Sequence, residues 1–240
     1  MNAFLWSIGA DEVVSEIPLT WWAEDAPEKS QENNTFSRET LQRLSDPISL
    51  DSPKSLHFET LKDLRLALEA ITDFALKQTA TQLVFGEGPL NPDIMVIGEA
   101  PGNEEDQSGR PFVGVSGQLM NRMLSAAGYA RETCYITNMI PWRPPGNRTP
   151  TPDEVTRMMP FLREHIRLVQ PKSLLVLGGV SAKAILGTDT GIMRLRGRIH
   201  TLEGLGIPVV PTFHPSYLLR TPLQKQQAWE DVLMLKERLG

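Results

Sequence analysis

Acidic, amide and imidazole side chains stand in three glycine- and proline-rich segments of this chain. The segments are "GEAPG" at residues 98–102, "TN" at 137–138 leading to "RPPGNR" at 143–148, and "HPSYLLR" at 214–220. Glycine lets backbone amides approach a ligand closely, and proline fixes the turn so that these amides stay aimed. Alone, "GEAPG" is typical of an ordinary turn, without the spacing or lysine of a phosphate loop. Together the segments indicate a ligand site, provided that the fold brings them together.

The elements around these segments predict how they are positioned. Near-continuous apolar runs at 93–100, 134–140, 173–179 and 208–215 are expected of parallel strands covered on both faces. Residues 116–128 and 151–171 have helical periodicity, the latter with a capping-box spacing at its start. This alternation predicts an α/β fold, a three-layer α/β/α sandwich with a central four-stranded mainly parallel sheet. Ligands of such sheets bind outside the carboxyl ends of the strands, where the three segments fall.

The chain divides into an acidic first part and a mildly basic second part. Residues 1–79 carry 7 Lys and Arg against 14 Asp and Glu, whereas residues 80–240 carry 17 against 15. We predict a partly flexible N-terminal extension at 1–55 and a folded domain at 56–240 that opens with a helix over 58–78. Arginines concentrated at 143–148 and 194–198 suit an anionic partner.

No membrane span or signal peptide is indicated, so we expect a cytoplasmic protein that does not bind membranes. Its one cysteine, Cys134, lies in an apolar run and is predicted to be a core residue.

The ordered motifs of the second part resemble those of the family-four uracil-DNA glycosylases. They are "VFGEG", "GEAPG", "EED", "GRPFVG", "YITN", "RPPGNR", "LRGR.H" and "TFHPSYLLR", and the resemblance covers residues 74–240. It implies a uracil-DNA glycosylase-like domain and a DNA repair enzyme that flips uracil out of DNA. The enzyme then hydrolyses the N-glycosidic bond and leaves an abasic site.

The resemblance also implies which residues bind and release uracil. Phe112 would stack under the base, and the amide of Asn138 would read its edge because an amide both donates and accepts. His214 would donate to O2 of the departing uracil, and Glu99 would orient water or balance the cationic sugar. Backbone amides around Gly98, Glu99, Ala100 and Pro101 would complete the oxyanion site. Ala100 replaces the Asp of family-one enzymes, so no strong general base is evident.

DNA contacts are expected from the arginine loops and from the segment after His214. Tyr217, Leu218 and Leu219 would act as wedges in the base stack, or would be ordinary buried helix residues. Contacts to phosphates would give affinity without sequence preference. The residues expected to make them are Arg143, Arg148, Ser216 and Arg220, with further DNA contacts from Arg196, Arg198 and His200.

One departure from the family concerns a cofactor. Most family-four members bind a four-iron cluster through four cysteines, and the corresponding positions here hold Ile71, Phe74, Trp142 and Met158. An iron–sulfur cluster needs thiolates, so we expect no cluster, no metal and no other cofactor. A hydrophobic plug around Trp142 is expected to join the first helix to the arginine loop.

Alternatives to hydrolysis are a protein that binds uracil-containing or abasic DNA without cleaving it, and one that becomes covalently attached. Relatives that attach carry a reactive histidine at the place of His200, but they have Gln at the place of Ala100 and a longer basic run. Turnover is therefore favoured. The chain is expected to act as a monomer, with residues 1–55 as a possible contact for other repair proteins.

Overall fold

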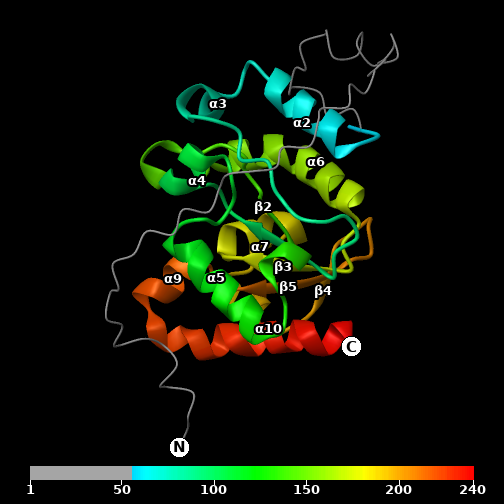
Figure 1. Cartoon of the computed structure of the whole chain (residues 1–240), viewed down its shortest axis with the longest axis vertical. Helices are drawn as coiled ribbons and strands as arrows, with labels where there is room; N and C mark the ends of the chain where they lie inside the picture. The colour runs from blue at the N-terminus through cyan, green and yellow to red at the C-terminus, as the bar shows by residue number, and fades with distance from the viewer. Residues whose placement is uncertain (1–55) are drawn as a thin grey trace, which may run out of the picture. The chain divides into compact units, whose positions relative to one another are not determined.

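A five-stranded sheet forms the centre of residues 56–240, the part of the chain that this computed structural model describes (Figure 1). The strand order is β2-β1-β3-β5-β4, with all pairs parallel except β4 with β5. The strands are β1 (Ile94–Gly98), β2 (Tyr135–Asn138), β3 (Ser173–Leu177), β4 (His200–Thr201) and β5 (Pro208–Thr212). The predicted α/β class with a mainly parallel sheet is therefore confirmed.

The predicted number of strands was wrong by one. The four apolar runs form β1, β2, β3 and β5, and the additional strand β4 pairs His200 with Val209 and Thr201 with Pro208. A strand of two residues has no periodicity of its own. It exists because the chain turns back between residues 202 and 207 and lays residues 200–201 along the edge of β5.

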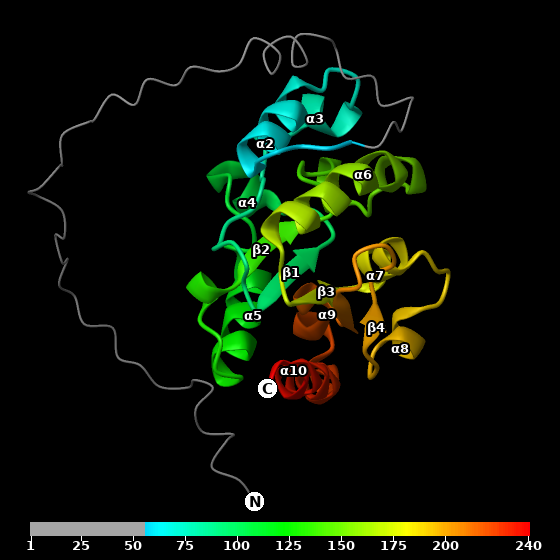
Figure 2. The same cartoon turned by 90° about the vertical axis from the view of Figure 1, so that its right-hand side faces the viewer.

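Helices cover both faces of the sheet (Figure 2). Along β1, Met95 and Ile97 belong to one core cluster, whereas Ile94 and Val96 belong to another, as the period of two along a strand requires. The first cluster includes residues of α2 (Leu61–Ala70), α6 (Pro152–Val169) and α7 (Gly179–Leu186). The second includes residues of α5 (Val115–Ala126) and α10 (Lys225–Leu239).

Shorter helices occupy the connections. They are α3 (Ala75–Thr79), α4 (Asn103–Ser108), η2 (Arg131–Thr133), η3 (Pro145–Asn147), α8 (Ile192–Leu195), α9 (Pro215–Arg220) and η4 (Pro222–Gln224). The helix predicted over 58–78 is two helices, α2 and α3, because Ile71 has extended backbone and ends α2. The predicted capping box of Thr151 and Glu154 starts α6.

The predictions for residues 1–55, an acidic extension with one short helix and a linker, lie outside the described residues. Within residues 56–240, every helix is too short or too polar to span a bilayer.

Candidate functional site

A cavity of about 630 Å³ opens at the carboxyl ends of the parallel strands. Its walls come from the segments that follow β1, β2, β3 and β5, and from α8 and α9. The three segments singled out in the sequence therefore do meet. The predicted residues that line this cavity are Glu99, Ala100, Pro101, Phe112, Asn138, Arg148, His214, Ser216, Tyr217 and Arg220.

Gly98, Phe112 and Asn138 are packed against one another at the end of β1. A Cβ atom on Gly98 would lie 2.4 Å from Oδ1 of Asn138 and 2.4 Å from Cζ of Phe112. Gly98 is also the register partner of Asn138 in β2, so the sheet itself fixes the position of the amide. Glycine at 98 thus lets an aromatic face and an amide share one wall of the cavity.

The amide of Asn138 is buried without being satisfied. The residue is 5% exposed, and its Oδ1 has no hydrogen-bond partner among residues 56–240. Leaving such an acceptor unpaired costs about 1–3 kcal/mol. A polar ligand edge in the cavity would remove this cost, so Asn138 is a candidate binding residue.

Phe112 forms an aromatic wall in a strained backbone conformation. Its φ is 52°, in the left-handed region that a bulky residue adopts at a cost of about 1–3 kcal/mol. The side chain is 5% exposed, and its ring centroid lies 5.9 Å from that of His214. The next two residues are held by Glu105, whose Oε1 accepts the N–H groups of Val113 and Gly114 at 3.0 and 2.9 Å.

His214 is held as a neutral hydrogen-bond donor. Its Nδ1 accepts the backbone N–H of Ser216 at 3.2 Å and lies 2.8 Å from the Ser216 hydroxyl. Because an N–H group can only donate, Nδ1 carries no proton, and the neutral ring is protonated at Nε2. Burial, and secondarily the charge of Arg220, lower the pKa of His214 to about 4. The Nε2–H group is thus the one available to a ligand in the cavity.

Glu99 is half-buried in the cavity wall beside Thr149. Burial raises the pKa of Glu99 above its ordinary value, and a hydrogen bond from Thr149 partly opposes this effect. A carboxylate in such a place can orient a water molecule or balance a developing positive charge.

The cationic residues expected to contact DNA differ in their surroundings. Arg220 and Arg148 lie at the cavity, with Arg148 paired to Glu154 at 2.6 Å. The guanidinium of Arg143 donates to Asn147 and Asn103, both at 2.7 Å, and so joins η3 to α4. Arg198 is exposed and lies with His200 beside a second hollow near β4, and neither residue lines the first cavity.

Two expectations are corrected by burial. Arg196 was expected to meet phosphate, but it is bound to the fully buried Asp231 at 3.0 Å and stacks over the ring of Phe213. Its charge is therefore neutralised within the fold. Leu218 was expected to be a wedge, but it is 0% exposed and packs in a core cluster. Leu219 is 40% exposed and remains at the surface.

His200 lies in β4 and not at the first cavity. Its Nε2 is 2.8 Å from the backbone oxygen of Leu195, and its strand partner is Val209 near the start of β5. The cavity is at the opposite end of that strand. This placement argues against covalent attachment through His200.

Other residues of the site were missed from the sequence. Glu105, Thr149, Ile192 and Met193 line the cavity, yet none of them was assigned a role. Only Glu105 gave a signal, since it stands in the quoted "EED" motif. The role of Glu105 depends on the amides of Val113 and Gly114, which donate to its carboxylate only in the folded chain.

Adding one methyl group at Gly98 tests this packing. We expect Gly98→Ala to weaken ligand binding at least tenfold, because the new Cβ displaces Phe112, Asn138 or both. Gly179→Ala is the control, since Gly179 lines the cavity and its added Cβ would make an ordinary 3.7 Å contact. Titration of free nucleobase into each variant measures the effect. Equal affinities in the two variants would contradict the packing described.

Fold and cavity together define an α/β protein whose cavity is lined by an aromatic ring, a buried amide and an imidazole, the kinds of group that line small-molecule sites. Comparison with known families is more specific. The Uracil DNA glycosylase superfamily matches residues 85–233, and the chain belongs to this superfamily.

Curated relatives agree with this assignment. The chain is 44% identical over 141 residues to the type-4 uracil-DNA glycosylase of Thermotoga maritima, a match that covers 58% of this chain and 73% of the relative. It is 34% identical over 188 residues to the type-4 enzyme of Archaeoglobus fulgidus, covering 76% and 94%. It is also 31% identical over 149 residues to the type-5 uracil-DNA glycosylase of Pyrobaculum aerophilum, covering 55% and 64%.

Proposed function

We propose that this protein is a DNA repair glycosylase that releases uracil from DNA and leaves an abasic site. The observation that carries the proposal is the buried Oδ1 of Asn138, which has no hydrogen-bond partner within residues 56–240 and lies beside the ring of Phe112. The edge of a pyrimidine can donate to this oxygen while its face stacks on the ring. Several relatives at 34–44% identity are type-4 uracil-DNA glycosylases.

Uracil recognition follows from the donor and acceptor pattern. The base stacks on Phe112, Oδ1 of Asn138 accepts from N3–H of uracil, and the amide nitrogen donates to O4. Cytosine presents an unprotonated N3 and an amino group at these positions and is rejected, because both hydrogen bonds would be reversed. Glu99, Ala100 and Pro101 line the same cavity.

Cleavage of the N-glycosidic bond places negative charge on uracil, and His214 is the proposed donor to this charge. The bond between the sugar C1′ and N1 of uracil breaks, and the electron pair leaves with the base. His214 donates from Nε2 to O2 of the uracil anion, where the negative charge gathers. Glu99 stabilises the cationic sugar and orients the water that adds to C1′, and the proton lost by this water passes to solvent or to the base.

DNA binding is assigned to the rim of the cavity. Arg148, Ser216 and Arg220 contact phosphates there, and Tyr217 or Leu219 enters the stack in place of the flipped nucleotide. Arg143 and Arg198 remain candidates for further phosphate contacts. We assign this activity to the domain at 56–240, and action as a monomer in the cytoplasm remains a prediction.

The residues present do not fit the four-iron cluster of most family-four members. Ile71, Phe74, Trp142 and Met158 are each at most 2% exposed and belong to one hydrophobic cluster, in which the rings of Phe74 and Trp142 lie 5.5 Å apart. The one cysteine, Cys134, belongs to the cluster on the other face of the sheet, and burial raises its pKa to about 11. A single thiol on that face cannot supply the four thiolate ligands that such a cluster needs.

The purified protein is therefore expected to be colourless and free of iron, because apolar side chains stand at the four positions of the cluster ligands. Absorbance near 400 nm and elemental analysis of the full-length protein test this expectation. Stoichiometric iron with a band near 400 nm would contradict it. An iron–sulfur relative purified in the same way is the positive control.

Incubation with a uracil-containing oligonucleotide, followed by alkali, tests the proposed reaction. Strand scission at the uracil position is expected, together with free uracil in the supernatant. A retarded but intact strand would instead indicate binding without hydrolysis. An adduct that survives denaturant would indicate covalent attachment, and either result would overturn the proposal.

A further inference from the structure

Arg131 donates hydrogen bonds to the backbone at Phe112, the residue proposed to stack on uracil. Its Nη1 donates to the carbonyl oxygen of Phe112 at 3.0 Å, and its Nη2 donates to that of Pro111 at 2.6 Å. Nη1 also donates to Oδ1 of Asn121 on α5 at 3.0 Å. One guanidinium therefore fixes two consecutive peptide groups directly at the left-handed residue Phe112.

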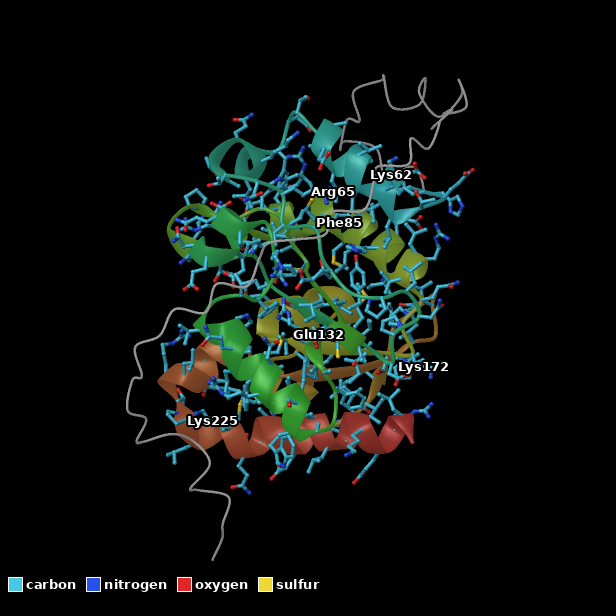
Figure 3. All side chains as sticks on the ribbon, in the orientation of Figure 1. Lys62, Arg65, Phe85, Glu132, Lys172 and Lys225 are labelled. Atoms are coloured by element: carbon cyan, nitrogen blue, oxygen red, sulfur yellow. The ribbon has the colours of Figure 1, made fainter. Side chains whose placement is uncertain are left out.

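The guanidinium is itself held in place. Arg131 is paired with Glu87 at 2.7 Å, and its side chain is 15% exposed. Hydrogen bonds from Arg110 and Arg131 lower the pKa of Glu87, so that its carboxylate stays charged. Arg131 starts η2, which packs against α5, and the next residue, Glu132, is labelled in Figure 3. The planar guanidinium has donors in a fixed arrangement and can bind two carbonyls at once, whereas the single ammonium group of a lysine lacks this geometry.

Two further contacts complete the support of this loop. The carboxylate of Glu105 accepts the amide N–H groups of Val113 and Gly114, the two residues that follow Phe112. On α5, a Cβ atom at Gly117 would lie 1.9 Å from the carbonyl oxygen of Phe112, so the helix is in direct contact with this peptide. Arg131 is not among the residues that line the cavity.

We infer that Arg131 is a positioning residue that fixes the ring of Phe112 for stacking on the base, acting through the carbonyls of Pro111 and Phe112. This inference rests on the proposed function and deepens it. Without the guanidinium, two partly buried carbonyls lose this donor, and the strained φ of Phe112 loses contacts that help to maintain it. The ring then samples other orientations, and part of the stacking is lost.

Arg131→Met and Arg110→Met form a matched pair for the test. Both arginines bind the carboxylate of Glu87, but the side chain of Arg110 is 61% exposed and, within residues 56–240, donates only to Glu87. We expect Arg131→Met to weaken the binding of free uracil about 10- to 100-fold, as loss of hydrogen bonds from a charged group does. Arg110→Met should stay within about twofold of the wild type.

Two readouts separate positioning from a general structural defect. Binding of DNA with a stable abasic-site analogue should change less than about threefold in Arg131→Met, because this substrate has no base to stack. In a double-mutant cycle with Phe112→Leu, Arg131→Met should add little to the loss of uracil affinity, because both changes remove the same interaction. Should Arg131→Met fail to fold, Asn121→Ala removes one anchor of the guanidinium and should give a smaller loss in the same direction.

Unchanged uracil affinity in Arg131→Met, or fully additive effects with Phe112→Leu, would overturn the inference. Equal losses for uracil and for the abasic analogue would do so as well, since they would indicate a fold-wide effect. Uracil affinity is measured on the full chain without turnover. If the wild-type protein bound free uracil but released none from DNA, the proposed reaction would be refuted. The inference about Arg131 would still be decided by the binding measurements above.

Discussion

Replacement of His214 by alanine is expected to lower kcat for uracil release by about 10²- to 10³-fold, the usual effect of removing one donor to a developing oxyanion. The fall should appear in kcat more than in KM, because the Nε2–H group meets full negative charge only as the bond breaks. Single-turnover kinetics on a uracil-containing oligonucleotide measure it.

The control for this variant is Ser216→Ala. It removes the hydroxyl beside Nδ1 but keeps the backbone N–H that selects the tautomer, so the donor at Nε2 survives. We expect a loss of less than about tenfold in this control. A loss of less than fivefold in His214→Ala, or one confined to KM, would show that the imidazole does not stabilise the leaving group.

The pH dependence of kcat should also reflect a His214 side chain that stays neutral. Because the pKa of His214 in the folded protein is lowered to about 4 from 6.5, the ring stays neutral from pH 8 down to about pH 5, and kcat should show no step near 6.5 from this residue. Stability follows the sign of this shift. The unfolded chain binds the extra proton between pH 6.5 and 4, so the contribution of His214 to stability is present above pH 6.5 and is lost as the pH falls through this window.

Replacement of Asn138 by alanine should lower kcat/KM for uracil by about 100-fold or more, because the N3 and O4 groups of the bound base lose both partners in a buried site. The preference for uracil over cytosine should also be lost, since the amide supplies it. Competition between uracil- and cytosine-containing oligonucleotides measures this preference directly.

Thr137→Val is a suitable control because it changes the neighbouring residue of the same strand. Thr137 donates to the carbonyl oxygen of Phe85 at 2.7 Å and does not line the cavity. It should lower the free energy of unfolding by about 1 kcal/mol and leave uracil affinity nearly unchanged. If both variants lost uracil affinity equally, Asn138 would be a residue of strand packing rather than a reader of the base.

Much of this fold could be predicted because its signals are local. The four long strands are continuous apolar runs, and the start of α6 is set by Thr151 and Glu154 within one turn. Where the signal was weak, prediction failed. The two residues of β4 pair only because β5 is beside them, and the break between α2 and α3 comes within one unbroken helical pattern.

The sequence by itself determined the residue types of the site, since Gly98, Phe112, Asn138 and His214 stand in motifs whose order points to one edge of a parallel sheet. Tertiary structure decided which charges and apolar groups remain available. Arg196 and Leu218 also stand in motifs of this series, yet Arg196 is paired with the buried Asp231 and Leu218 is buried in a core cluster. The contacts of Glu105 and Arg131 with the loop around Phe112 also arise only on folding. Hydrogen bonds to distant backbone groups leave no periodicity in a sequence, because any residue supplies the same carbonyl and N–H.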